Sequence, residues 1–176
     1  NKFEGEIAAC IVEPIAGSTG ILVPPKGYLN RLRKICDKHG ILLIFDEVIT
    51  GWGRTGSPFA AQEFNVTPDI MTLAKATTNG VVPMGVVAVR DGIYDAVVDS
   101  APEGAIELFH GYTYSGIPSA VAAALAVQDI FEKENIFNRV KEISPYFQEA
   151  LHSLRDLECV ENIRGYGLLG GVDIRK

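Results

Sequence analysis

The segment ILLIFDEV, residues 41–48, is an apolar run that ends in two acidic residues. A short run of large aliphatic side chains is typical of a buried strand in a parallel sheet whose two faces are both covered. In an open parallel sheet, ligands bind beyond the carboxyl ends of the strands, and Asp46 lies at such an end. The segment therefore predicts an α/β fold and places Asp46 where a site is expected.

Strand-like and helical segments alternate along the first part of the chain. The sequence predicts a helix over residues 28–39, where apolar residues recur at helical spacing and Gly40 follows as a C-cap. Short apolar runs predict four strands, at residues 7–12, 41–45, 70–73 and 86–89. Strand, helix and strand in this order predict a parallel sheet with right-handed crossovers.

The character of the sequence changes from Pro118 onward. Two long helices are expected there, and Pro145 should interrupt or kink the second one. After Asp156 the sequence becomes strand-like and rich in glycine. We therefore assign residues 1–155 to a large α/β domain with its following helices, and 156–176 to the start of a second, truncated domain. Because the chain opens without Met and stops in a strand-like segment, we expect it to be a piece of a larger protein.

Composition excludes several classes of partner. The chain has 176 residues, a net charge of −6 and 16 basic residues that form no cationic stripe, so we expect no nucleic-acid partner. No apolar run approaches the ~20 residues that span a bilayer, so we expect no membrane partner. The three cysteines lack the spacing of a zinc site or a disulfide framework, which favours a reduced, cytoplasmic location and no metal site.

Asp46 alone is compatible with several roles. It could cap the next helix or be a surface charge, or it could bind Mg²⁺ in a nucleotide-binding module. The magnesium interpretation requires a GxxxxGK[ST] loop upstream, and the preceding residues offer only GSTG at 17–20, without the lysine. A third possibility is that Asp46 holds the ring nitrogen of a pyridine cofactor.

Lys75, in the segment LAKATTNG at residues 73–80, favours the third possibility. Most lysines are solvated surface groups. Lys75, however, follows a strand-like run roughly 30 residues after Asp46, about the length of one βαβ unit, so its amine should emerge at the same sheet edge. Pyridoxal phosphate needs an amine for its aldehyde and an anion beside its ring nitrogen. Because successive side chains of a strand point to opposite faces, Glu47 should point away from the face that carries Asp46, and Val48 can lie against the cofactor ring.

Five ordered blocks of sequence carry a resemblance to a known family. They are EPIAGSTGILVPPKGYL (13–29), LLIFDEVITGWGRTG (42–56), PDIMTLAKATTNG (68–80), HGYTYSGIP (110–118) and RGYGLLGGVDI (164–174). The chain resembles the class III (subgroup II) aminotransferases, which are fold type I pyridoxal-phosphate enzymes, and among them most closely the ω-amino acid:pyruvate (β-alanine:pyruvate) transaminases. The resemblance implies a large domain with a mostly parallel sheet and helices on both faces, followed by the start of a small C-terminal α+β domain.

The resemblance also implies a role for individual residues. Lys75 would form the Schiff base with pyridoxal 5'-phosphate, and Asp46 would bind the ring nitrogen with Val48 packed on the ring. Thr113 would donate its hydroxyl to the cofactor phosphate of the neighbouring subunit, in a homodimer with shared active sites. Glu13 would support the site through hydrogen bonds.

The implied activity is the transfer of an amino group from an ω-amino acid or amine to pyruvate, so that the partners are a small amino donor and a keto acid acceptor. Three alternatives remain open: another class III enzyme (other acceptor, aminomutase or decarboxylase), a nucleotide-binding module, and a non-catalytic remnant that only dimerises. Two positions depart from the family, Ile49, where many relatives carry Gln, and Ile117, where His or Asn is common. Trp52 is either a packing residue or a substrate wall.

Overall fold

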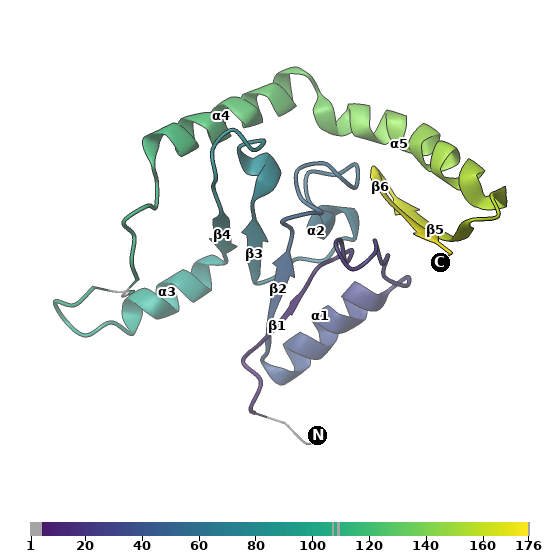
Figure 1. Cartoon of the computed structure of the whole chain (residues 1–176). Helices are drawn as coiled ribbons and strands as arrows, with labels where there is room; N and C mark the ends of the chain where they lie inside the picture. The colour runs from purple at the N-terminus through teal and green to yellow at the C-terminus, as the bar shows by residue number, and fades with distance from the viewer. Residues whose placement is uncertain (1–4, 107, 109, 176) are drawn as a thin grey trace.

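A four-stranded sheet forms the centre of the fold. The structure, a computed structural model, describes residues 5–106, 108 and 110–175. The strands lie in the order β1 (Ala9–Val12), β2 (Leu42–Asp46), β3 (Ile70–Leu73) and β4 (Val86–Val89), as Figure 1 shows. All four predicted strands are therefore confirmed.

The sheet is mostly parallel, with an antiparallel edge. Strand β2 pairs in parallel with both β1 and β3, whereas β4 pairs antiparallel with β3. The expectation of parallel pairing was wrong for β4. A parallel crossover usually contains an α-helix, and residues 74–85 contain only the short 3-10 turn η1 (Lys75–Thr77), so the chain reverses direction after β3.

Helix α1 (Tyr28–His39) covers one face of the sheet and forms the core. Gly40 ends the helix in the left-handed conformation, φ 64°, as predicted, and its N–H caps the last turn. The core cluster joins the helix to the strands and consists of Leu29, Cys36, Leu43, Phe45 and Val66. These side chains are nearly fully buried, and their burial accounts for the alternation along β2.

The opposite face of the sheet carries Asp46 and remains partly open in this chain. Thr72 pairs with both Asp46 and Val87 across the strands, so all three lie on this face. Ile11 and Val87 on this face are 60% and 65% exposed. The expected cover by helices on both faces is thus present only on the α1 side within the described residues.

The remaining helices are short or lie outside the sheet. They are α2 (Ala60–Glu63), α3 (Asp91–Asp99), α4 (Pro118–Lys133) and α5 (Ile136–His152). Helices α4 and α5 form an arc along one end of the sheet (Figure 1). Helix α5 runs through Pro145 without interruption, so the predicted interruption is absent, and the alternative of a kink stays a prediction. Among the described residues, no helix has the length and apolarity needed to cross a membrane.

A separate hairpin follows helix α5 and the 3-10 turn η2 (Ser153–Asp156). Its strands β5 (Val160–Tyr166) and β6 (Leu169–Ile174) confirm the predicted strand-like character of the C-terminal segment. The hairpin turn is attached to the loop that follows β2, because the Leu168 N–H donates to the Arg54 carbonyl at 2.9 Å. Gln148 of α5 donates to the Gly167 and Leu169 carbonyls at 2.8 and 3.0 Å. The domain boundary near residue 155 stays a prediction.

Candidate active site

Asp46 lies at the carboxyl end of β2. It is the last residue of the strand, is half-buried, and stands opposite Thr72 in the parallel pairing with β3. Its Oδ1 accepts the backbone N–H of Val48 at 3.0 Å. This local bond fixes the carboxylate at the strand end, beyond which ligands of parallel sheets bind.

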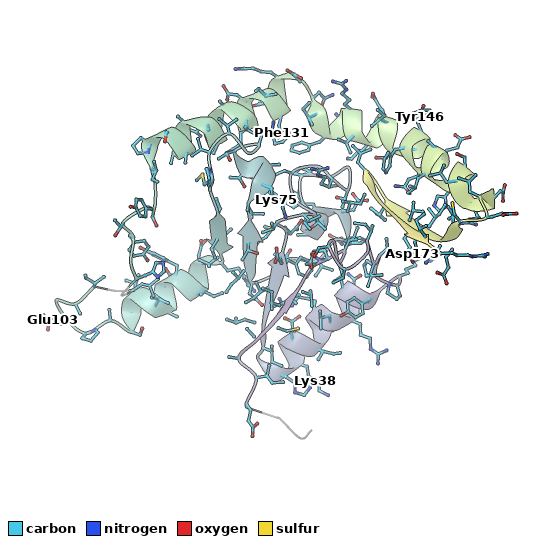
Figure 2. The ribbon with its side chains drawn as sticks, in the orientation of Figure 1. Lys38, Lys75, Glu103, Phe131, Tyr146 and Asp173 are labelled. Atoms are coloured by element: carbon cyan, nitrogen blue, oxygen red, sulfur yellow. The ribbon has the colours of Figure 1, made fainter. Side chains whose placement is uncertain are left out.

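Lys75 lies at the same end of the neighbouring strand. It follows Thr72 by three residues and begins the turn η1, with a left-handed backbone, φ 51°. Figure 2 shows Lys75 at the end of the sheet that faces helix α4. Among the described residues, none of the ion pairs involves Lys75. The structure therefore brings Asp46 and Lys75 to one sheet edge, as the sequence predicted.

A cavity of about 270 Å³ contains Lys75. It is lined by Val48, Ile49, Gly51, Arg54, Lys75, Ala76 and Leu169. Val48 and Lys75 thus lie together, as expected. Sequence reasoning missed Arg54 and Leu169. Arg54 follows Gly53 in a loop without periodicity, and Leu169 comes from the β5–β6 hairpin, so neither carries a local signal of its position.

Glu47 has a structural role distinct from that of Asp46. Its carboxylate is fully buried and accepts the backbone N–H groups of Ala60 and Ala61, at 2.7 and 2.8 Å, and the Thr50 hydroxyl at 3.0 Å. Burial raises the pKa of Glu47, although the three donors oppose the shift. Glu47 therefore points to the opposite face, as predicted, and it is Glu47 rather than Asp46 that holds the first turn of α2.

Glu13 contacts the loop that follows β1. Its Oε2 accepts the backbone N–H of Gly17 at 2.9 Å. Gly17 packs so closely against Ile49 that a Cβ at this position would overlap the Ile49 side chain. Because Ile49 lines the Lys75 cavity, Glu13 is linked to the cavity by two successive contacts. Its expected supporting role stays a prediction.

Thr113 is not brought to the Lys75 cavity. It is exposed and lies in the turn that precedes α4, where Ile117 is the N-cap residue and Pro118 the first helical residue. Pro at this position suits a helix start, because its missing N–H would have no helical partner. The predicted role of Thr113 requires a second subunit and stays a prediction.

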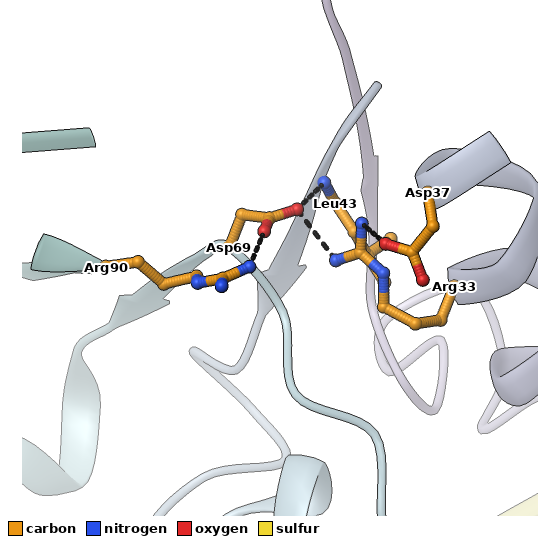
Figure 3. Close-up of polar contacts among 5 residues, drawn as sticks. All are labelled: Arg33, Asp37, Leu43, Asp69 and Arg90. Atoms are coloured by element: carbon orange, nitrogen blue, oxygen red, sulfur yellow. Dashed lines mark hydrogen bonds and ion pairs between the residues drawn. The ribbon is translucent and has the colours of Figure 1, made fainter. Parts of the chain in front are cut away.

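A second charged cluster lies at the other end of β2 and β3 (Figure 3). Asp69 is buried. Its carboxylate accepts hydrogen bonds from the Arg33 and Arg90 guanidinium groups and from the Leu43 backbone N–H, each at 2.7 Å. Burial raises the pKa of Asp69, but these donors outweigh burial and lower the pKa below its ordinary value. Both of its carboxylate oxygens accept hydrogen bonds, so the cluster connects α1, β2 and the residue that follows β4.

The described residues contain no group of three or more His, Cys, Asp or Glu side chains placed to hold a metal ion. The arrangement at the Asp46 edge instead offers a primary amine, a carboxylate and an aliphatic side chain. An amine can condense with an aldehyde, and a carboxylate can hold a protonated ring nitrogen.

Comparison with known proteins agrees with this arrangement. The chain is 56% identical over 168 residues to the omega-aminotransferase of Caulobacter vibrioides and 53% identical over 169 residues to the omega-amino acid–pyruvate aminotransferase of Pseudomonas putida. In both cases 96% of this chain is covered, and it spans 38% of the relative's length. The structure superposes on an (S)-enantioselective omega-transaminase from Thermomicrobium roseum with a TM-score of 0.89 at 40% identity, covering 96% of this chain and 37% of that one.

The model of the class-III aminotransferase family matches residues 1–176, which is the whole chain. The structure also superposes on a transaminase from the marine bacterium Virgibacillus with a TM-score of 0.86 at 40% identity, covering 94% of this chain and 37% of that one. The chain therefore belongs to the class-III aminotransferase family.

Proposed function

We propose that the intact protein is a pyridoxal-phosphate-dependent transaminase that moves an amino group from an ω-amino acid or amine to pyruvate. The observation that carries this proposal is the convergence of Asp46 and Lys75 at one end of neighbouring parallel strands. The names of relatives support the substrate class, since one acts as an omega-amino acid–pyruvate aminotransferase and another as a beta-alanine–pyruvate aminotransferase.

The residues at this edge fit the cofactor. Asp46 uses Oδ1 to accept the Val48 N–H, and its carboxylate retains further acceptor capacity for a ring N–H. Val48 lines the same cavity as Lys75 and offers an aliphatic surface for a flat ring. When bound, pyridoxal phosphate supplies an aldehyde for amines and a protonated ring that withdraws electrons.

The roles of the chain's own residues follow from their chemistry. Lys75 would hold the cofactor aldehyde through its amine. Its Nζ, when free, would act as general base and then as general acid, taking a proton from the substrate carbon and giving it up again. Asp46 would favour a protonated ring nitrogen, because a neighbouring anion stabilises the charged form of the ring.

The site is completed by a second subunit in this proposal. Thr113 would donate its hydroxyl to the cofactor phosphate of the neighbouring subunit in a homodimer. Its exposure, and its absence from the lining of the Lys75 cavity, support a contact outside its own subunit. A cytoplasmic location accompanies the proposal.

The test is the Lys75→Ala substitution in the intact protein, with Lys141→Ala, a lysine of helix α5, as the matched control. We expect Lys75→Ala to abolish the lysine-bound chromophore and the formation of alanine from pyruvate, while Lys141→Ala keeps both. A borohydride-reducible cofactor adduct at position 75 of the parental protein, identified by peptide mass, supports the proposal. Its absence with saturating pyridoxal phosphate would overturn it.

Product analysis separates the proposed reaction from related ones. A transaminase needs a keto acid acceptor and converts pyruvate into alanine. An aminomutase would rearrange the substrate without an acceptor, and a decarboxylase would release carbon dioxide. If the amine substrate were consumed at the parental rate without any keto acid, over many turnovers, the transaminase assignment would be wrong.

A further inference from the structure

A side-chain hydrogen bond connects Trp52 to the turn that carries Lys75. The indole Nε1–H of Trp52 donates to Oγ1 of Thr77 at 3.0 Å, and the Thr77 hydroxyl donates to the Ala74 carbonyl at 3.1 Å. Thr77 is the last residue of η1 and is only 3% exposed. Because an indole N–H only donates and a carbonyl only accepts, the direction of both bonds is fixed.

Each of the two segments that this connection joins contains a residue with an unfavourable backbone. Trp52 and Lys75 are non-glycine residues in the left-handed region, with φ of 60° and 51°. Large side chains rarely adopt this conformation, and it persists where surrounding contacts enforce it. The Trp52–Thr77 bond joins the two strained segments, which lie after β2 and after β3.

Two backbone bonds of the Lys75 turn are long. The N–H groups of Thr78 and Gly80 reach the Lys75 carbonyl at 3.4 and 3.3 Å, whereas ordinary N–H···O bonds are about 2.9–3.0 Å. The contacts of Thr77 are shorter, because its backbone N–H and its hydroxyl both donate to the Ala74 carbonyl at 3.1 Å. Thr77 therefore closes the turn onto Ala74, and Trp52 supplies a donor to the hydroxyl that takes part in this closure.

The donor itself is held in place by aromatic contacts. The Trp52 ring packs edge-on against Phe59, with 5.3 Å between centroids, and stacks on Phe131 of α4 at 5.9 Å. Trp52 does not line the Lys75 cavity, although its loop neighbours Gly51 and Arg54 do. The ring is thus directed toward α4, which argues against a substrate wall.

We propose that Trp52 is a positioning residue that acts through Thr77. Its N–H orients the Thr77 hydroxyl, which closes the turn onto Ala74 and fixes the direction in which Lys75 presents its amine. The catalytic part of this inference rests on the function proposed above. The mechanical part, the closure of the turn, concerns the protein without cofactor and is tested separately.

Hydrogen exchange in the intact, cofactor-free protein tests the closure. Thr77→Val and Trp52→Phe each remove one partner and should speed exchange of the Thr77 and Thr78 amides about fivefold to tenfold, the effect of one net hydrogen bond. Thr77→Ser keeps the hydroxyl and should match the parent. The double variant should exchange no faster than Thr77→Val, with the Phe45 amide unchanged as the measure of overall folding. Parental rates in both single variants, or multiplied effects in the double variant, would overturn the inference.

Capture of pyridoxal phosphate tests the positioning of Lys75. The adduct is trapped with borohydride at timed intervals and measured by peptide mass. We expect capture at Lys75 to slow about fivefold in Thr77→Val and Trp52→Phe, but not in Thr77→Ser. Faster amide exchange with parental capture rates would overturn the positioning role. A parental protein that captures nothing at Lys75 would instead overturn the proposed function and the catalytic part of this inference, while the exchange result stands.

Discussion

The Glu47 carboxylate accepts the backbone N–H of Ala60 at 2.7 Å, although the adjacent residue, Asp46, points to the other face of the sheet. Two consecutive acids thus divide two tasks. Glu47 satisfies backbone donors at the start of α2, where an acid is favourable, and Asp46 is left for a ligand. Substitution of Glu47 should therefore affect mainly stability, and substitution of Asp46 mainly turnover.

Replacing Glu47 should chiefly affect stability. Glu47→Ala leaves three donors without their acceptor in a buried place, so we expect a loss of about 3 kcal/mol in the free energy of unfolding. Glu47→Gln keeps one acceptor and should lose about half as much. Urea denaturation of the intact protein measures both. An unchanged denaturation midpoint in Glu47→Ala would contradict the structural role.

The pH dependence of this effect has a defined sign. Burial raises the folded pKa of Glu47 above its ordinary value of 4.5. Its contribution is therefore fully present below the unfolded pKa and is lost as pH rises through the folded pKa. The advantage of the parental protein over Glu47→Gln should be largest below pH 4.5 and should shrink as the pH rises above it. A constant difference across this range would refute the shift.

Asp46→Asn should affect turnover far more than stability. The neutral amide no longer favours a protonated ring, so we expect turnover to fall about 100-fold, while cofactor is still captured at Lys75. Asp129→Asn, an exposed position on α4, is the matched control and should keep parental turnover. Steady-state kinetics and adduct mass measure the two quantities. Parental turnover in Asp46→Asn would show that the acid has another role.

Asp69 should be the main determinant of stability at the opposite end of the sheet. Asp69→Asn leaves the Arg33 guanidinium, whose side chain is 17% exposed, without its main counter-charge, so we expect a loss of about 3 kcal/mol at neutral pH. Because the folded pKa of Asp69 is lowered, its contribution is present above the unfolded value of 3.8 and is lost as pH falls through the folded pKa. Denaturation at neutral pH and below pH 3.8 should show the difference shrinking in acid.

The control for this prediction is the exposed end of the same network. Asp37 pairs with Arg33 at 2.8 Å, but its side chain is 62% exposed. Asp37→Asn should therefore lose less than about 1 kcal/mol. If Asp37→Asn and Asp69→Asn were equally destabilising, the burial of Asp69 would not explain its contribution to stability.

The sequence predicted that Asp46 and Lys75 lie at one end of the sheet because the signals for this are local. The apolar runs before Asp46 and Lys75 mark two strands, and the carboxyl ends of parallel strands meet at one edge. The direction of β4 was not predictable from its apolar run, since strand direction depends on the connection and β-branched residues suit either pairing. Pro145 was expected to break α5, but packing of that helix on the hairpin, where Phe147 and Leu151 approach Gly170, favours one continuous helix.

Contacts between segments far apart in the sequence also could not be predicted from local sequence patterns. Leu169 reaches the Lys75 cavity only because the hairpin turn is bonded to Arg54. Likewise, the Trp52–Thr77 bond joins loops after two different strands, and neither residue type predicts the other. The sequence left Trp52 between packing and a substrate wall, and the structure gives it a packed position with a specific donor role.

Shared active sites are tested by mixing two inactive variants of the intact protein, Lys75→Ala and Thr113→Ala, under conditions that allow subunits to exchange. If Thr113 serves the phosphate of the neighbouring subunit, each mixed dimer has one site with both lesions and one site with neither. Mixing should then restore about half the parental activity per mixed dimer. If Thr113 serves its own subunit, every site keeps one lesion and mixing restores nothing. Lys75→Ala mixed with Asp46→Asn is the control, because both residues belong to one subunit's site, and it should restore no activity above that of the separate variants.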